Sequence, residues 1–173
     1  MNRDKIKNAI RNIPDFPKPG IQFKDITTLL QDHVAFSESI DIFCDKFGNN
    51  EIDLIVGIES RGFIFGAPVA LRLGCPFAIA RKAGKLPAKT VSAEYELEYG
   101  TDSVEIHKDA IKKGDRVLIM DDLIATGGTA SAVGELVTKC QGDITGFAFL
   151  ISLAELKGSD KLKPHPVFAI IDF

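Results

Sequence analysis

The sequence has no tryptophan, only three cysteines and no long apolar run. Cys44, Cys75 and Cys140 are odd in number and far apart, without CxxC or Cys/His spacing, so they indicate neither a disulfide framework nor a zinc site. Each is expected to be a small buried apolar residue. The most apolar stretch, 144–153, is interrupted by glycine and serine and is shorter than the roughly 18 residues of a membrane helix. The sequence therefore predicts no membrane span.

A secretory signal and an excess of positive charge are also missing. The first twelve residues mix charged and amide side chains with isolated apolar ones, so they lack the apolar core of a signal peptide, and a cytoplasmic location is expected. The formal net charge of -3 argues against a protein that binds by neutralising a nucleic acid backbone. Positive charge is local, because the segment from Arg81 to Ala93 carries four basic and no acidic residues. Its glycine and proline predict a loop.

The chain is expected to form a single domain over residues 1–173. With 45% apolar and 26% charged residues, it has enough material for one sizeable core. Apolar residues between Ile6 and Ile13 recur at helical spacing and predict a short helix that Pro14 stops. A proline-rich turn and a short β-like run, 21–24, follow.

The remainder of the chain alternates between helical and strand patterns. Apolar residues of 36–47 fall on one helical face and predict a helix ending near Gly48. Short continuous apolar runs, typical of strands buried on both faces, then alternate with further helical stretches. The runs are 53–58, 116–120 and 144–153, and the helical stretches are 63–73 and 128–140. This order predicts an α/β fold, with a mostly parallel sheet flanked by helices and ligands beyond the carboxyl ends of the strands.

One run of residues combines the features of a sugar phosphate site. The expected strand 117–120 leads through Asp121 and Asp122 to a glycine- and threonine-rich loop, 125–129, and then to a helix. Inward backbone N–H groups, threonine hydroxyls and the positive helix start favour a phosphate. The two carboxylates can accept hydrogen bonds from a ribose diol. The loop is neither a Walker loop nor a dinucleotide fingerprint, because it lacks the Walker lysine and GxGxxG.

The run VLIMDDLIATGGT resembles the phosphoribosyl pyrophosphate (PRPP) signature of type I phosphoribosyltransferases. IPDFPKPGIQFKDIT, ESRGFIFGAPVA, RKAGKLP and EYELEYG leading into VEIHKDAI are similar, in order and spacing, to the adenine phosphoribosyltransferases within that family. The resemblance covers about residues 13–162. It implies the type I phosphoribosyltransferase fold, with a base-binding hood within residues 1–35 and a flexible flap at 82–106. The implied reaction is purine salvage, in which adenine and PRPP give AMP and pyrophosphate.

The same resemblance implies roles for individual residues. The ribose and 5-phosphate of PRPP or AMP would be bound by Asp121, Asp122, Ala125, Thr126, Gly127, Gly128 and Thr129. Pyrophosphate would be bound by Ser60, Arg61, Lys82 and Lys85. Adenine would be bound by Gln22, Phe23, Lys24 and Leu123. Phe23 and Leu123 would stack on opposite faces of the base, and backbone groups near Gln22 and Lys24 would select the 6-amino group. Glu98 would be the general acid/base.

Magnesium and a homodimer complete what the resemblance implies. The Mg²⁺ would be held mainly by substrate oxygens and water, with no protein ligand directly assigned. The sequence departs from the common family pattern in the hood. Gln22 replaces a usually apolar residue, Lys24 stands where many members have arginine, and Thr28 stands where proline is usual. These departures affect base recognition only if side chains contribute to it.

Two other functions are compatible with the phosphate loop. A phosphoribosyltransferase for another purine, such as xanthine, could share the hood. A PRPP-binding regulator would need a DNA-reading module, but residues 1–50 contain seven basic and seven acidic residues and are nearly filled by the hood motif. No nucleic acid partner is therefore expected. The isolated histidines are expected to be surface or packing residues, namely His33, His107 and His165.

Overall fold

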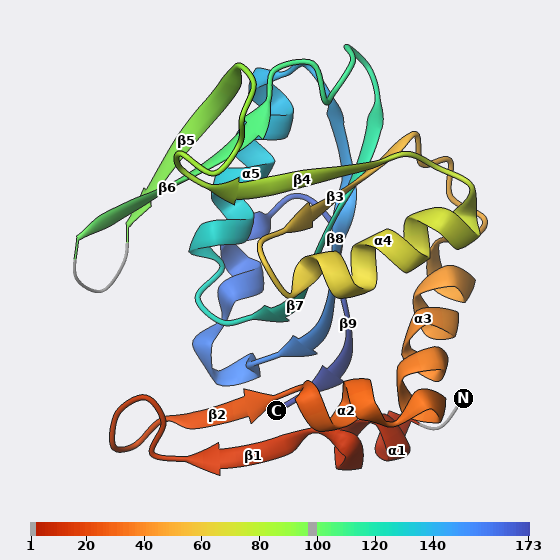
Figure 1. The fold of residues 1–173 in the computed structure, drawn as a ribbon, viewed down its shortest axis with the longest axis vertical. Helices are drawn as coiled ribbons and strands as arrows, with labels where there is room; N and C mark the ends of the chain where they lie inside the picture. Colours follow the sequence, from red (N-terminus) through yellow and green to blue (C-terminus); the bar gives the residue numbers. More distant parts are fainter. Residues whose placement is uncertain (1–2, 97–99) are drawn as a thin grey trace.

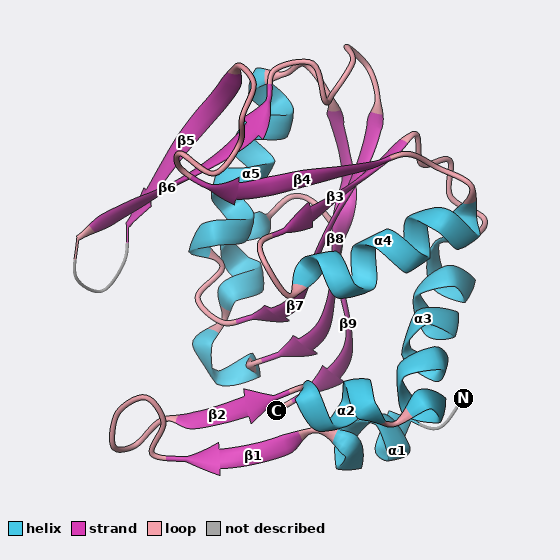
Figure 2. Cartoon of the chain, viewed as in Figure 1, coloured by secondary structure: helices cyan, strands magenta, loops and turns pink. Residues whose placement is uncertain are grey.

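The computed structural model describes residues 3–96 and 100–173 and has a seven-stranded sheet at its centre (Figures 1 and 2). The strand order is β5-β6-β4-β3-β7-β8-β9. The strands are β3 (Leu54–Ile58), β4 (Phe77–Lys82), β5 (Thr90–Glu96), β6 (Thr101–His107), β7 (Arg116–Ile124), β8 (Asp143–Ser152) and β9 (Val167–Asp172). Strands β4, β3, β7, β8 and β9 are parallel, whereas the β5–β6 hairpin joins β4 antiparallel. The predicted α/β fold with a mostly parallel sheet is confirmed.

Helices cover both faces of this sheet. The helices are α1 (Arg3–Ala9), α2 (Thr27–Gln31), α3 (His33–Phe47), α4 (Gly62–Leu73) and α5 (Gly128–Lys139), with 3-10 helices η1 (Ala154–Leu156) and η2 (Gly158–Leu162). Leu118 and Met120 of β7 pack in a core with α3 and α4, while Val117 and Ile119 pack in a second core with α5. Successive side chains of a strand point to opposite faces, so a strand between two cores is apolar throughout.

The amino-terminal segment differs from the sequence prediction. Helix α1 ends at Ala9, and β1 (Arg11–Pro14) forms an antiparallel hairpin with β2 (Gln22–Asp25). The predicted helix up to Ile13 is therefore wrong beyond Ala9. Ile13 lies opposite Phe23 in the hairpin. A tertiary pairing with β2 thus replaces the helical hydrogen bonds that the apolar spacing suggested.

The cysteines and histidines lie outside the phosphate loop. All three thiols are free and only partly buried, not fully buried as expected, and burial raises the pKa of each. His165 packs on Phe147, with ring centroids 6.2 Å apart, and His33 is exposed at the start of α3. None of the helices formed by the described residues has the length and apolarity that a bilayer span requires.

Candidate functional site

Strand β7 is longer than the sequence predicted. It was expected to end at Met120, but it continues to Ile124 by pairing with β8, and Asp121 lies opposite Phe149. The acidic pair is therefore part of the strand and not of the loop that follows. The pairing of this backbone with β8 fixes where both carboxylates lie.

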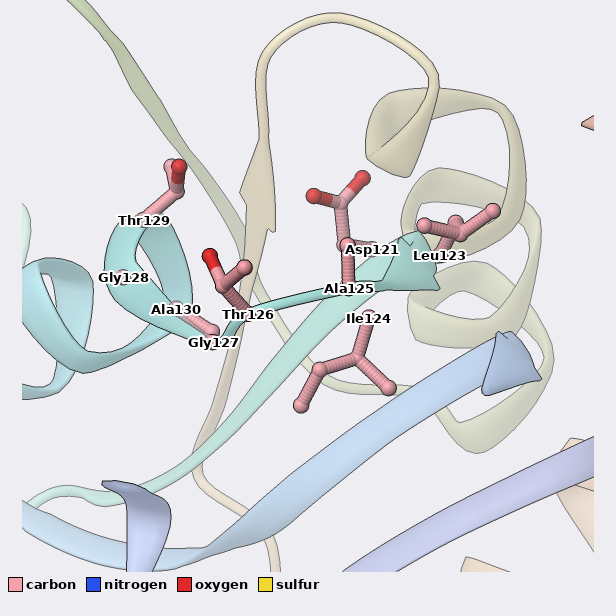
Figure 3. Close-up of a pocket in the computed structure, with 9 residues that line it drawn as sticks. All are labelled: Asp121, Leu123, Ile124, Ala125, Thr126, Gly127, Gly128, Thr129 and Ala130. Atoms are coloured by element: carbon pink, nitrogen blue, oxygen red, sulfur yellow. The ribbon is translucent and has the colours of Figure 1, made fainter. Parts of the chain in front are cut away.

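A hollow of about 120 Å³ lies where β7 turns into α5. It is lined by Asp121, Leu123, Ile124, Ala125, Thr126, Gly127, Gly128, Thr129 and Ala130. The side chains of Asp121, Thr126 and Thr129 extend to one side of the loop, whereas Ile124 extends to the other (Figure 3). The structure thus brings the predicted loop residues together around one small polar space.

The shape of this loop depends on close backbone contacts. Gly127 has a positive φ of 78° and precedes α5, which has no side-chain cap. A Cβ on Gly127 would lie 2.3 Å from the Gly158 carbonyl oxygen, and one on Gly158 would lie 2.2 Å from the Ala125 oxygen. Only glycine fits at either position. The first N–H groups of α5 have no side-chain acceptor at Gly127, so they are suited to an anion.

The two carboxylates of the acidic pair are in unusual electrostatic surroundings. Burial and the charge of Asp122 raise the pKa of Asp121 well above its ordinary value. Burial also raises the pKa of Asp122, an effect that the nearby Arg61 opposes. Arg61 Nε lies 3.0 Å from Asp122 Oδ2, but this ion pair lacks hydrogen-bond geometry. Asp122 Oδ2 is buried and accepts no hydrogen bond within the described part of the chain. A ligand that brings a hydroxyl or a cation would satisfy it.

These oxygens fit a magnesium ion that takes its other ligands from substrate. Mg²⁺ prefers oxygen ligands and usually keeps several waters while binding one or two carboxylates and substrate phosphates. A cation beside Asp121 and Asp122 would also relieve their mutual repulsion. Over residues 3–96 and 100–173, no group of three or more His, Cys, Asp or Glu side chains could hold a metal ion alone.

The residues predicted for pyrophosphate lie near the carboxyl ends of β3 and β4. The Glu59–Ser60 peptide is cis, Ser60 is exposed, and Arg61 precedes α4. Lys82 and Lys85 were predicted to bind pyrophosphate through their positive charge. Instead, Lys85 Nζ is 2.7 Å from Glu59 Oε1 and Lys82 Nζ is 2.8 Å from Asp102 Oδ2. The acids paired with these lysines were missed, because the contacts join segments that are far apart in sequence.

Glu59 accepts several hydrogen bonds in this region. Lys85 and Arg81 donate to Oε1, and the Lys82 backbone N–H donates to Oε2. Burial alone would raise the pKa of Glu59, but these three donors outweigh it and lower the pKa to about 2. Glu59 is therefore ionised near neutral pH and holds two basic side chains at the loop before α4.

The β1–β2 hairpin lies next to these groups. The guanidinium carbon of Arg61 is 5.5 Å from the centroid of the Phe23 ring, so one arginine contacts both the hairpin and Asp122. Gln22 and Lys24 extend to the face of β2 opposite Phe23. There Asn12 donates to Gln22 Oε1 at 2.7 Å and accepts from Lys24 Nζ at 3.0 Å. Phe23 therefore lies near the acidic pair, whereas the side chains of Gln22 and Lys24 are hydrogen-bonded to Asn12 on the other face of the hairpin.

The predicted catalytic residue Glu98 lies outside the described residues. Strand β5 ends at Glu96 and β6 begins at Thr101, so the structure describes the two sides of the expected flap. Strands β5 and β6 form one edge of the sheet and project beyond its other strands (Figure 1). The loop expected over 81–93 is present at 83–89 only, because β4 includes Lys82 and β5 begins at Thr90.

Comparisons with known proteins agree with this geometry. Residues 25–172 match the phosphoribosyl transferase domain family. The chain is 54% identical over 173 residues to the adenine phosphoribosyltransferase of Chloroflexus aurantiacus, which covers 100% of both proteins. The chain belongs to the adenine phosphoribosyltransferase family. The resemblance seen in the sequence motifs is thereby confirmed.

Solved structures of this family have the same fold. An adenine phosphoribosyltransferase from Thermoanaerobacter pseudethanolicus superposes with a TM-score of 0.97 at 52% identity, covering 99% of this chain and 100% of that one. The Saccharomyces cerevisiae enzyme gives a TM-score of 0.93 at 44% identity, covering 98% of each chain. The latter was crystallised with adenine and an imino-altritol 1,6-bisphosphate. The similarity that assigns the chain to the phosphoribosyltransferase family and to the type I fold therefore covers nearly the whole length of the chain.

Proposed function

We propose that this protein joins adenine to PRPP, forming AMP and releasing pyrophosphate. The observation that carries the proposal is the hollow between β7 and α5, with Asp121 at one side and the glycine–threonine loop at the other. The 5-phosphate binds to the loop from Ala125 to Thr129, where backbone N–H groups and hydroxyls are donors. The ribose hydroxyls donate to the two carboxylates. Oδ2 of Asp122, which is buried and accepts no hydrogen bond within the described part of the chain, supports this arrangement.

The pyrophosphate of PRPP binds beside this sugar site. Ser60, Arg61, Lys82 and Lys85 are its proposed ligands, and Arg61 already contacts the acidic pair. Pyrophosphate carries more negative charge than one carboxylate, so it can compete with Glu59 and Asp102 for the lysines. When bound, Mg²⁺ would neutralise charge on the pyrophosphate and so favour its departure. The ion would be held mainly by substrate oxygens and water, and Asp121 or Asp122 would contact it through water.

Adenine lies between Phe23 and Leu123. The β1–β2 sheet has two strands among the described residues, so one edge of β2 has no strand partner and its backbone groups can meet the base. Carbonyl oxygens near Gln22 and Lys24 accept from the 6-amino group, and a 6-oxo purine would leave them unpaired. The side chains of Gln22 and Lys24 are tied to Asn12, which supports recognition by backbone. Their departure from the common family pattern then has little effect on base choice.

The reaction forms a bond between adenine N9 and C1 of the ribose and breaks the bond from C1 to the pyrophosphate oxygen. Inversion at C1 results. Glu98 takes the proton that leaves the adenine ring nitrogens. Closure of the flap, residues 82–106, excludes water from the oxocarbenium-like species.

A substitution tests the role of Glu98. Glu98→Gln removes the base but keeps the size of the side chain, so kcat is expected to fall by about 100-fold or more with little change in KM. Glu96→Gln is the matched control, because Glu96 is exposed on β5 two residues away. Steady-state kinetics measure both variants. Unchanged kcat in Glu98→Gln, or an equal loss in the control, would remove Glu98 from this role.

One assay tests the function as a whole. The pure protein is supplied with PRPP, Mg²⁺ and adenine, each omitted in turn, and AMP is measured. Hypoxanthine, guanine and xanthine then replace adenine. AMP formation that needs all three components is the expected result. Turnover of xanthine but not of adenine would instead show that xanthine is the substrate base. Binding of PRPP without transfer to any base would instead favour a regulator.

We also propose that the protein works as a homodimer in the cytoplasm, as the family resemblance implies. Sedimentation equilibrium distinguishes a mass of about twice 18.8 kDa from a monomer. Cell fractionation tests the location.

A further inference from the structure

Lys82 is paired with a second residue of the flap. Asp102 on β6 faces Tyr95 across the β5–β6 hairpin. Asp102 Oδ2 accepts from Lys82 Nζ at 2.8 Å and from the Tyr95 hydroxyl at 3.2 Å. Its other oxygen, Oδ1, accepts from the Ser103 backbone N–H at 2.8 Å. One carboxylate oxygen is thus shared between a lysine and a tyrosine.

Tyr95 also reaches the phosphate loop. A methyl group built on Gly128 would lie 3.7 Å from the Tyr95 ring. Burial raises the pKa of Tyr95, and the neighbouring Thr129 side chain opposes this shift. Tyr95 therefore keeps its proton near neutral pH and is a donor to Asp102. The Tyr95 ring therefore lies beside Gly128, the first residue of α5.

The ion pair is well placed to compete with a ligand. The Lys82 side chain is 61% exposed and that of Asp102 is 24% exposed, so the ammonium can leave Asp102 without crossing the core. Asp102 keeps two donors after Lys82 leaves, namely Tyr95 and the Ser103 N–H. A carboxylate that retains donors is less costly to separate from its cation than a bare one.

We propose that Asp102 is an internal competitor of pyrophosphate for Lys82, and that Tyr95 weakens the hold of Asp102 on this lysine. Asp102 thereby lowers the affinity of the site for pyrophosphate and favours its release as product. This inference rests on the proposed function, in which Lys82 binds the pyrophosphate. It assigns opposite effects to two neighbouring residues that do not themselves touch the substrate.

The test uses two variants of the whole protein. Asp102→Asn removes the competing charge, so pyrophosphate is expected to bind about three- to tenfold more tightly. Tyr95→Phe keeps the ring but removes the donor that shares Asp102 Oδ2, so pyrophosphate is expected to bind about threefold more weakly. Calorimetric titration with pyrophosphate in the presence of Mg²⁺ measures both. Glu94→Gln is the control, because it removes one negative charge from an exposed position of the same hairpin.

Two further measurements separate this inference from a general effect. Ribose 5-phosphate lacks the pyrophosphate, so its affinity is expected to stay within about twofold in each variant. In a Lys82→Ala background, the effects of Asp102→Asn and Tyr95→Phe on pyrophosphate binding are expected to vanish. Equal pyrophosphate affinity in wild type and Asp102→Asn, or tightening by the control as well, would overturn the inference. A wild-type protein that neither binds pyrophosphate nor forms AMP would instead overturn the proposed function.

Discussion

Among single residues, Glu59 connects the acid–base balance of the site to the stability of the fold. Its side chain is 12% exposed and its partners Arg81 and Lys85 are 31% and 46% exposed. Because the pKa of Glu59 is lowered to about 2, its ionised form is stabilised in the folded protein. The exposure of Lys85 weakens this contribution through solvent screening. Glu59 therefore stabilises the fold by less than its lowered pKa alone suggests.

A change at Glu59 should make stability depend on pH in a defined direction. Glu59→Gln removes the charge that Lys85 and Arg81 approach, so the free energy of unfolding at pH 7 is expected to fall by about 1–2 kcal/mol. A lowered carboxyl pKa stabilises the fold above the unfolded value, about 4.3, and this contribution is lost as pH falls towards 2. The difference between variant and wild type should therefore shrink below about pH 4.5.

Urea unfolding at pH 7 and pH 3 measures this difference. Glu51→Gln is a suitable comparison, because Glu51 pairs with Arg116 in a surface pair and its side chain is 83% exposed. A loss of stability in Glu59→Gln that is equal at both pH values would mean that the carboxylate acts by shape and not by charge.

At the scale of elements, the hood hairpin is anchored at one end of β2. Asp25 is 8% exposed and accepts from the Thr27 backbone N–H, the Thr27 hydroxyl and Arg11. The Thr27 N–H and the Arg11 guanidinium are the main reasons that the pKa of Asp25 falls to about 2. These bonds link β1, β2 and the start of α2. They should therefore set the position of Phe23 in the same hairpin.

Loosening this anchor should affect the base more than the sugar phosphate. Asp25→Asn is expected to lower the free energy of unfolding by about 1 kcal/mol and to raise KM for adenine about three- to tenfold, with KM for PRPP little changed. Steady-state kinetics with each substrate varied in turn measure the split. An equal rise in both KM values would show that the hairpin does not act on the base alone.

Asp32→Ala is the matched control for a general loss of stability. Asp32 caps α3 by accepting from the Val34 and Ala35 backbone N–H groups, at 3.0 and 3.1 Å. Loss of such a cap costs about 0.5–2 kcal/mol, similar to the expected effect at Asp25. Because α3 contributes no residue to the proposed base site, KM for adenine should not change. A rise in this variant would attribute the Asp25 effect to stability.

The sequence predicted those elements whose pattern is local. Helix α3 ends before Gly48, as predicted from the apolar face over 36–47, and the buried strands β3 and β8 follow continuous apolar runs. Strand β1 could not be predicted, because its conformation depends on pairing with β2. The extension of β7 through two aspartates was missed for a similar reason. Charged residues rarely occur in an interior strand unless a ligand or a partner compensates them.

The same division applies to the site. The phosphate loop was recognisable because its residues are contiguous and α5 follows directly. Gly158 packs on that loop from more than 30 positions away, and Asp102 meets Lys82 from a different strand. Neither residue has a local pattern that indicates its contact. The phosphate loop could thus be identified from sequence. The contacts of Gly158 with that loop and of Asp102 with Lys82 could be identified only from the structure.

At the scale of the whole molecule, the order of strands brings the proposed ligand groups together. Strands β3 and β7 are parallel neighbours, so Ser60 and Asp121 lie at the same edge of the sheet. The carboxyl ends of parallel strands commonly form ligand sites. A ligand that contacts both segments should therefore stabilise the whole fold and not only one loop.

Binding of AMP should be visible in the unfolding temperature. At a concentration of about 100 times Kd, a ligand adds about 2.7 kcal/mol of stability, which corresponds to a rise in Tm of about 5–11 °C for a domain of this size. Asp121→Asn is expected to reduce this rise to below about 3 °C, because a ribose acceptor is lost. Differential scanning calorimetry at pH 7, with and without AMP, measures both proteins, and adenosine tests the contribution of the phosphate.

The raised pKa of Asp121 also predicts how wild type and Asp121→Asn compare in stability without AMP. Burial and the charge of Asp122 make the ionised form of Asp121 unfavourable in the folded state. A raised carboxyl pKa means that the folded protein binds more protons than the unfolded one, so stability declines as pH rises from about 4 through the folded pKa. Without ligand at pH 7, Asp121→Asn should therefore melt no lower than wild type. A lower melting temperature without AMP, or an undiminished rise with AMP, would contradict a binding role for this carboxylate.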